Sequence, residues 1–104
     1  MFWSKKGNGL LPPKSIPDAV GRYLVVSLGR NPDWVWNLKA VMRSNGADKD
    51  TFEIRVFDQS RVADKGIKVR DYNTLGEHPE MILFEGWFNK RTFETKIQPQ
   101  EKSV

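Results

Sequence analysis

The segment WVWNLKAVMR, residues 34–43, constrains the fold more than any other part of this chain. Its apolar side chains recur at nearly every second position, and side chains at that spacing share one face of a β-strand. Two of the four tryptophans, Trp34 and Trp36, lie on that face. Because large aromatic side chains contribute about 2–3 kcal/mol each when they are fully buried, the segment predicts a strand at the centre of the core.

The length of 104 residues predicts one domain, because a single hydrophobic core needs most of that length. A hydrophobic fraction of 38% and an aromatic fraction of 12% are unlike those of disordered chains. Glycine and proline gather near the start. We therefore predict a flexible basic arm at residues 1–14, a single α+β domain at residues 15–98 and a C-terminal tail at residues 99–104.

Cysteine is absent, which excludes disulfides, thiolate nucleophiles and zinc sites built on sulfur. The first residues lack the continuous apolar stretch of a signal peptide, since two lysines and then glycines and prolines follow directly. No apolar run approaches the length that crosses a bilayer. These features predict a cytoplasmic protein without a membrane segment.

The formal net charge of +4 invites a nucleic-acid interpretation, so its distribution matters. Lys5, Lys6 and Lys14 precede Pro17 without any acid and account for +3 of it. The rest of the chain contains 14 basic and 13 acidic residues, so its formal net charge is only +1. Affinity for phosphates needs several cations on one track, so charge alone gives a nucleic-acid surface little support.

A helix is expected after the arm. Ser15 is a favoured N-cap, and Asp18 suits the positive end of the helix dipole. Apolar residues then follow at helical spacing until Gly29, which offers a left-handed stop. The alternative is a strand over residues 23–28, because Val25 and Val26 are β-branched.

Alternating patterns predict the remaining strands. The predicted elements are strands at 51–57, 81–88 and 92–98, a brief edge strand at 67–69, a short helix at 58–65 capped by its first residue, and a loop or single turn at 71–79. Together they predict an α+β fold with a four-stranded, mainly antiparallel sheet. The sheet is built from two β-hairpins, with the longer N-terminal helix on one face and the short helix between the hairpins.

Catalytic and metal-binding signals are sparse. His78 lies between Glu77 and Glu80, a composition that suits a general base or a metal ligand but equally a surface loop. The acids around residues 48–53 would suit a hard cation, yet their spacing is not that of a calcium loop and Lys49 lies among them. No phosphate-binding glycine motif occurs. We therefore expect a non-enzymatic protein without a cofactor or metal.

The sheet face turned away from the N-terminal helix is the remaining candidate site. It combines cations with large apolar side chains, and the predicted partner-binding residues on it are Trp87, Arg55, Phe57, Lys39 and Arg43. Exposed apolar patches with tryptophan and arginine are typical of protein contacts, so the leading hypothesis is binding of another protein or of a second copy.

Three other interpretations stay open. The cations and rings of this face, with the basic arm, would also suit single-stranded nucleic acid. The short helix or the segment after it would instead cover the face if either folds across it. An enzyme acting through His78 would require a pocket that reaches the imidazole.

Overall fold

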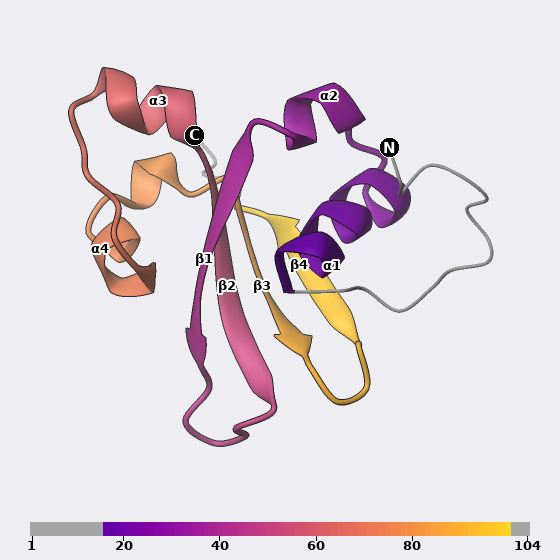
Figure 1. Ribbon diagram of the computed structural model, residues 1–104. Helices are drawn as coiled ribbons and strands as arrows, with labels where there is room; N and C mark the ends of the chain where they lie inside the picture. The colour runs from indigo at the N-terminus through magenta and orange to yellow at the C-terminus, as the bar shows by residue number, and fades with distance from the viewer. Residues whose placement is uncertain (1–15, 101–104) are drawn as a thin grey trace.

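The computed structural model describes residues 16–100 and consists of an antiparallel sheet with helices on both sides (Figure 1). The helical segments are α1 (Ile16–Arg22), the π-helical turn η1 (Tyr23–Ser27), α2 (Pro32–Val35), α3 (Gln59–Asp64), α4 (Tyr72–Gly76) and the 3₁₀ turn η2 (Pro79–Met81). The strands are β1 (Leu38–Ser44), β2 (Thr51–Asp58), β3 (Phe84–Asn89) and β4 (Thr95–Pro99). The predicted arm, with Ser15, lies outside the described residues, as does the end of the predicted tail.

The predicted class is confirmed: the fold is α+β with a four-stranded antiparallel sheet. The strands follow one another in the order β1-β2-β3-β4, so each pairs with its neighbour in the sequence. β1 and β4 are therefore the edge strands among the described residues. None of the helices in this part of the chain is long and apolar enough to cross a membrane.

The start of the predicted central strand is wrong. Residues 34–36 do not belong to β1, because a short helix precedes the strand. Asn31 caps that helix by accepting a hydrogen bond from the Asp33 N–H at 2.7 Å, and Pro32 occupies the first helical position. The helix buries Val35 and leaves Trp36 57% exposed. Trp34 is half-buried and packs edge-on against Phe84.

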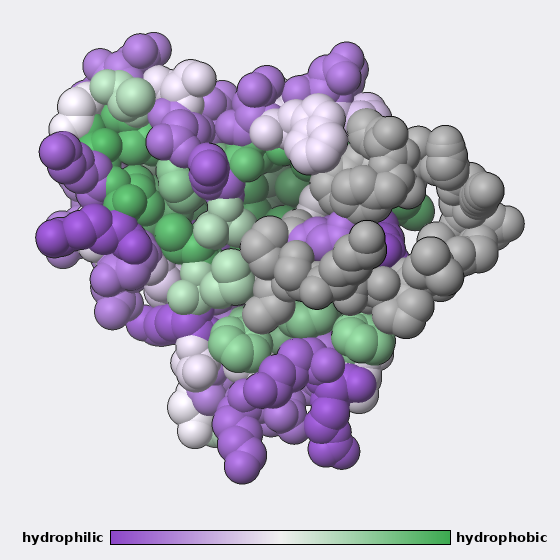
Figure 2. All heavy atoms as spheres, viewed as in Figure 1, coloured by the Kyte–Doolittle hydropathy of each residue, from purple (hydrophilic) through white to green (hydrophobic). Residues whose placement is uncertain are grey.

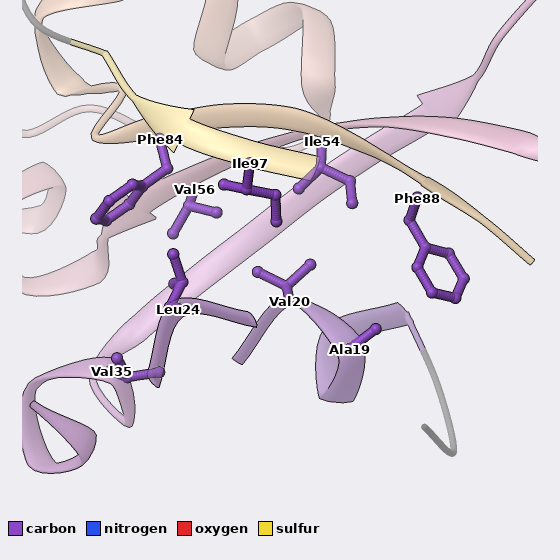
Figure 3. Close-up of a cluster of buried hydrophobic side chains, with 9 residues drawn as sticks. All are labelled: Ala19, Val20, Leu24, Val35, Ile54, Val56, Phe84, Phe88 and Ile97. Carbon is purple, nitrogen blue, oxygen red and sulfur yellow. The ribbon is translucent and has the colours of Figure 1, made fainter. Parts of the chain in front are cut away.

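Helix, not strand, forms over residues 23–27, where η1 directly continues α1. The segment ends near Gly29, whose φ of +66° is the left-handed conformation that glycine adopts without strain. Val20 and Leu24 point from this side toward Ile54, Val56 and Ile97 (Figure 3). These contacts form the first hydrophobic core, which holds the helix against the sheet.

The second sheet face carries its own core. Asp58 caps α3 by accepting from the Ser60 N–H, and Gly66 follows the helix with a φ of +72°. Residues 67–69 form no strand, which corrects that prediction. Instead, Ile67 and Val69 pack against a cluster under α3 and α4, which consists of Phe57, Val62, Leu75, Met81 and Ile82. The helices on this side therefore cover one part of the face.

Two strand boundaries also differ from the prediction. β3 begins at Phe84 rather than at residue 81, because Pro79 starts a 3₁₀ turn that ends at Met81. β4 begins only at Thr95, since residues 90–94 form the connection from β3. It extends to Pro99, which lies opposite Phe84.

Candidate functional site

Arg55, a predicted partner-binding residue, links β2 to α4. Its Nε donates to Glu85 Oε2 at 2.8 Å, and its Nη1 donates to the backbone carbonyl of Tyr72 at 2.9 Å. Glycine at position 76 leaves room for the guanidinium, since a Cβ there would lie 2.6 Å from Arg55 Nη1. Arg55 is therefore engaged in holding the fold together and is not a free surface cation.

Arg43 holds the same helix from the neighbouring strand. Its Nε donates to Glu53 Oε1 at 2.8 Å and its Nη1 donates to Asn73 Oδ1 at 2.8 Å. Its Cζ lies 4.3 Å from the centroid of the Tyr72 ring. Burial of that ring raises the pKa of the Tyr72 hydroxyl above its usual value, although Arg55 beside it acts in the opposite direction. Both arginines on this face thus have carboxylate and helix partners.

Phe57 is only 5% exposed and belongs to the second core. A ring that is buried to this degree mainly supplies folding energy and offers little surface to a partner. At this end of the face, α3, α4 and residues 67–69 pack over Phe57, so the covering alternative applies to this ring and not to Trp87, which lines an open groove.

Trp87 lines an open groove of about 620 Å³ at the hairpin end of the second face, between Glu53 on β2 and Lys96 on β4 in the strand register. The carboxylates that line this groove belong to Asp48, Glu53, Glu85 and Glu94, and no lysine or arginine lines it. Glu53 and Glu85 are paired with Arg43 and Arg55, and the remaining carboxylates of Asp48 and Glu94 disfavour phosphate in this groove. The predicted cations Arg43 and Arg55 are therefore engaged by carboxylates of this groove and are not presented beside Trp87 as free cations for phosphate.

Lys39 lies at a different place, on the outer edge of the sheet. Two hollows flank β1 there and both are lined by Lys39 and Ala40. The α3 hollow, of about 470 Å³, lies between β1, α3 and residues 67–70. The α2 hollow, of about 400 Å³, lies between β1, α2 and the α1–η1 helix. We call β1 with these two hollows the edge surface.

The walls of the edge surface are mostly apolar. Val41, Phe57, Val62, Ile67 and Val69 line the α3 hollow. The apolar residues that line the α2 hollow are Val20, Leu24, Val35, Trp36, Leu38 and Val56. Figure 2 shows hydrophobic atoms gathered between α3 and β1 and again beside α2, with hydrophilic atoms around them.

The charges of the edge surface have one sign. Lys39, Lys68 and Arg70 line the α3 hollow, and no aspartate or glutamate lines either hollow. Within residues 16–100 none of these three cations forms an ion pair, in contrast to Arg43 and Arg55. Unpaired cations around an apolar hollow favour a ligand that carries negative charge.

Sequence reasoning missed most of this surface. The alternating pattern predicts Trp36 in the core and an edge strand at residues 67–69. The available signal was the alternation of Ile67 and Val69 with Lys68 and Arg70, which does place apolar side chains on one side and cations on the other. The contact of this segment with β1 is tertiary and has no signature in the local sequence.

The catalytic candidates remain isolated. His78 Nδ1 lies 3.9 Å from Glu80 Oε2, and both side chains are partly exposed. Asp48 caps its own turn, where hydrogen bonds from the Asp50 N–H and the Thr51 hydroxyl lower the pKa of its carboxyl. No group of three or more potential metal ligands gathers in the part of the chain that the structure describes.

Comparisons with protein-family models, with curated proteins and with solved structures found no match to this chain.

Proposed function

We propose that this protein is a non-enzymatic, cytoplasmic interaction module that binds a protein partner at the edge surface. The observation that carries the proposal is the position of β1, an edge strand with a mostly apolar hollow on each side. An edge strand presents unpaired backbone groups, and apolar hollows with a polar rim accept side chains of a partner.

The proposal keeps the predicted architecture, two β-hairpins with the longer helix on one face, and changes the location of the contact. Of the five predicted residues, Lys39 lines the edge surface. Arg43 and Arg55 hold α4, Phe57 lies at the buried base of one hollow, and Trp87 lines the acidic groove. The proposed partner contact therefore lies at the β1 side of the second face and not in its middle.

Nucleic acid is the less favoured partner. Lys68 and Arg70 have no exposed aromatic ring beside them, because the only ring of the α3 hollow is the buried Phe57, and the one exposed ring of the edge surface, Trp36, lies with Lys39 in the α2 hollow. Base stacking on aromatic rings is a main source of affinity for single strands. In the groove around Trp87, the carboxylates of Asp48 and Glu94 oppose a phosphate backbone, and those of Glu53 and Glu85 occupy Arg43 and Arg55.

A selection from a random library of linear peptides displayed on phage tests the proposal. We expect enriched peptides that bind the wild-type protein. The double variant Trp36→Ala and Ala63→Gln, which removes a wall of one hollow and fills the other, should weaken their binding at least about tenfold. Ala47→Gln, at an equally exposed alanine in the β1–β2 hairpin, is the matched control and should leave binding unchanged.

Two outcomes would overturn the proposal. One is that no peptides are enriched. The other is that the enriched peptides bind the double variant as tightly as the wild type, which would place their contact elsewhere. A mixed-sequence single-stranded oligonucleotide is the parallel probe. If it alone binds, and its affinity falls steeply with salt, the nucleic-acid function replaces the protein partner.

A further inference from the structure

The hydrogen-bond pattern of β1 shows which of its backbone groups lack a partner within the sheet. The Asn45 N–H donates to the Thr51 carbonyl, and bonded pairs alternate along an antiparallel ladder. Counting back from Asn45 in steps of two residues, the N–H and C=O groups of Val41 point toward β2 in the observed register. The N–H and C=O groups of Ala40 and Met42 then face outward, where no described strand pairs with them.

A strand added at this edge would insert alternate side chains into the two hollows, because successive side chains of a strand point to opposite faces. One set would enter the α2 hollow, whose lining is apolar apart from Lys39. The other set would meet the α3 hollow, where Lys68 and Arg70 join Lys39. The side chains that enter the α2 hollow should therefore be apolar, and those that meet the α3 hollow should carry negative charge.

We infer that the partner segment is an extended peptide of alternating apolar and acidic residues that pairs with β1 as a fifth strand. Its backbone satisfies the outward groups of Ala40 and Met42, which supplies affinity. Its apolar side chains enter the α2 hollow, and its carboxylates pair with the cations of the α3 hollow. This inference rests on the proposed function, because it names the partner of the same surface.

Charge disfavours a second copy of the chain as the occupant. If two β1 strands paired about Val41, Lys39 of each copy would lie opposite Arg43 of the other, and like charges opposite each other destabilise a strand pair. Lysine on an edge strand is a common protection against such pairing. Residues 1–15 of the chain itself carry three lysines and no acid, so charge does not favour them either.

Three synthetic peptides with blocked ends test the inference. The first, EVEVEVE, has the inferred pattern. The second, EEEVVVE, has the same composition without the alternation, and the third, KVKVKVK, keeps the alternation with reversed charge. We expect EVEVEVE to bind at least about tenfold more tightly than either of the others, because only this peptide satisfies the two hollows and the strand edge together.

Amide hydrogen exchange, measured by NMR, reports the binding mode directly. With EVEVEVE bound, exchange of the outward Ala40 and Met42 amides should slow at least about tenfold. The Val41 amide, which already bonds to β2, serves as the internal reference and should change little. Docking of side chains alone would leave the outward amides unprotected.

A pair of charge-reversal variants tests the electrostatic part. Lys39→Glu with Lys68→Glu should weaken EVEVEVE binding at least about tenfold. Lys49→Glu with Lys96→Glu changes the net charge equally at exposed positions outside both hollows, and should have a much smaller effect. Equal loss in both variants would contradict recognition by the α3 hollow.

The outcomes separate this inference from the proposed function. If library-selected peptides bind the edge surface while EVEVEVE does not, or binds without amide protection, strand addition is wrong and the protein-binding function stands. If neither library peptides nor EVEVEVE bind, both proposals fail.

Discussion

The guanidinium Cζ of Arg55 lies 3.9 Å from the centroid of the Tyr72 ring, which is a cation–π contact between the sheet and α4. The same arginine bonds to Glu85 on the next strand and to the backbone carbonyl of Tyr72. One side chain therefore joins β2, β3 and α4. Because its side chain is only 20% exposed, these interactions are weakly screened by solvent.

Replacement of this arginine should destabilise the fold. Arg55→Met keeps the length of the side chain but leaves the Glu85 carboxylate and the Tyr72 carbonyl without their donor. The expected loss of unfolding free energy is about 1.5–3 kcal/mol, measured by urea denaturation. Arg61→Met, at an exposed position on α3, is the control and should change stability by less than about 0.5 kcal/mol. Equal midpoints for the two variants would show that Arg55 does not hold α4.

Stability should fall in strongly alkaline solution because of Tyr72. Burial raises the pKa of its hydroxyl in the folded state, so the unfolded chain loses this proton at a lower pH than the folded protein does. The tyrosine contribution is complete below the unfolded pKa of about 10 and declines as the pH rises through the folded pKa. Urea midpoints across this range should therefore fall more steeply for the wild type than for Tyr72→Phe. Parallel curves would contradict the assignment.

The parts of the fold that the sequence predicted correctly carry local signals. Ile54 and Val56 alternate with Glu53 and Arg55, and this pattern specifies both the strand and its core face. Asp58 caps the helix that follows directly, so a boundary between strand and helix could be located from one residue.

The error at Trp34 and Trp36 arose from two local signals that compete within a few residues. Alternation predicts a strand, whereas Asn31 and Pro32 start a helix. The helix forms, and it directs Val35 into the first core, although alternation with Trp34 and Trp36 would place Val35 on the opposite face. A period counted over so few residues cannot decide between these outcomes.

The candidate site was less predictable than the fold, because it depends on contacts between distant segments. Phe57 was expected on an open face, and only the packing of α3 and α4 across that face buries it. Likewise Arg55 lies 17 residues from the carbonyl that it binds. No short-range pattern records either contact.

Two aromatic substitutions should have very different effects. Phe84 is 2% exposed in the first core, and Phe84→Ala should lower the unfolding free energy by about 3–5 kcal/mol. Trp36 is 57% exposed, so Trp36→Ala should lower it by less than about 1 kcal/mol. Urea denaturation of both variants measures the difference. A large loss of unfolding free energy for Trp36→Ala would indicate that the tryptophan is buried in the core and would contradict an open α2 hollow.

Gly86 permits close contact between β3 and β4. An added Cβ would collide with the Lys96 carbonyl and lie 2.6 Å from Ile97 Cα, and both of these atoms belong to the backbone of β4. Alanine normally favours a strand over glycine, because glycine loses more backbone entropy on folding. Here the two strands must separate to admit the methyl group, so Gly86→Ala should destabilise by about 1–3 kcal/mol.

The matched control is Gly46→Ala in the β1–β2 hairpin. No atom lies within 4 Å of a Cβ built at Gly46, and its φ is not positive. The unfolding free energy of Gly46→Ala should stay within about 0.5 kcal/mol of the wild-type value in the same urea titration. If Gly86→Ala were equally neutral, β4 would have to move away from β3 at no cost, and the packing of Ile97 in the first core would not depend on that strand pair.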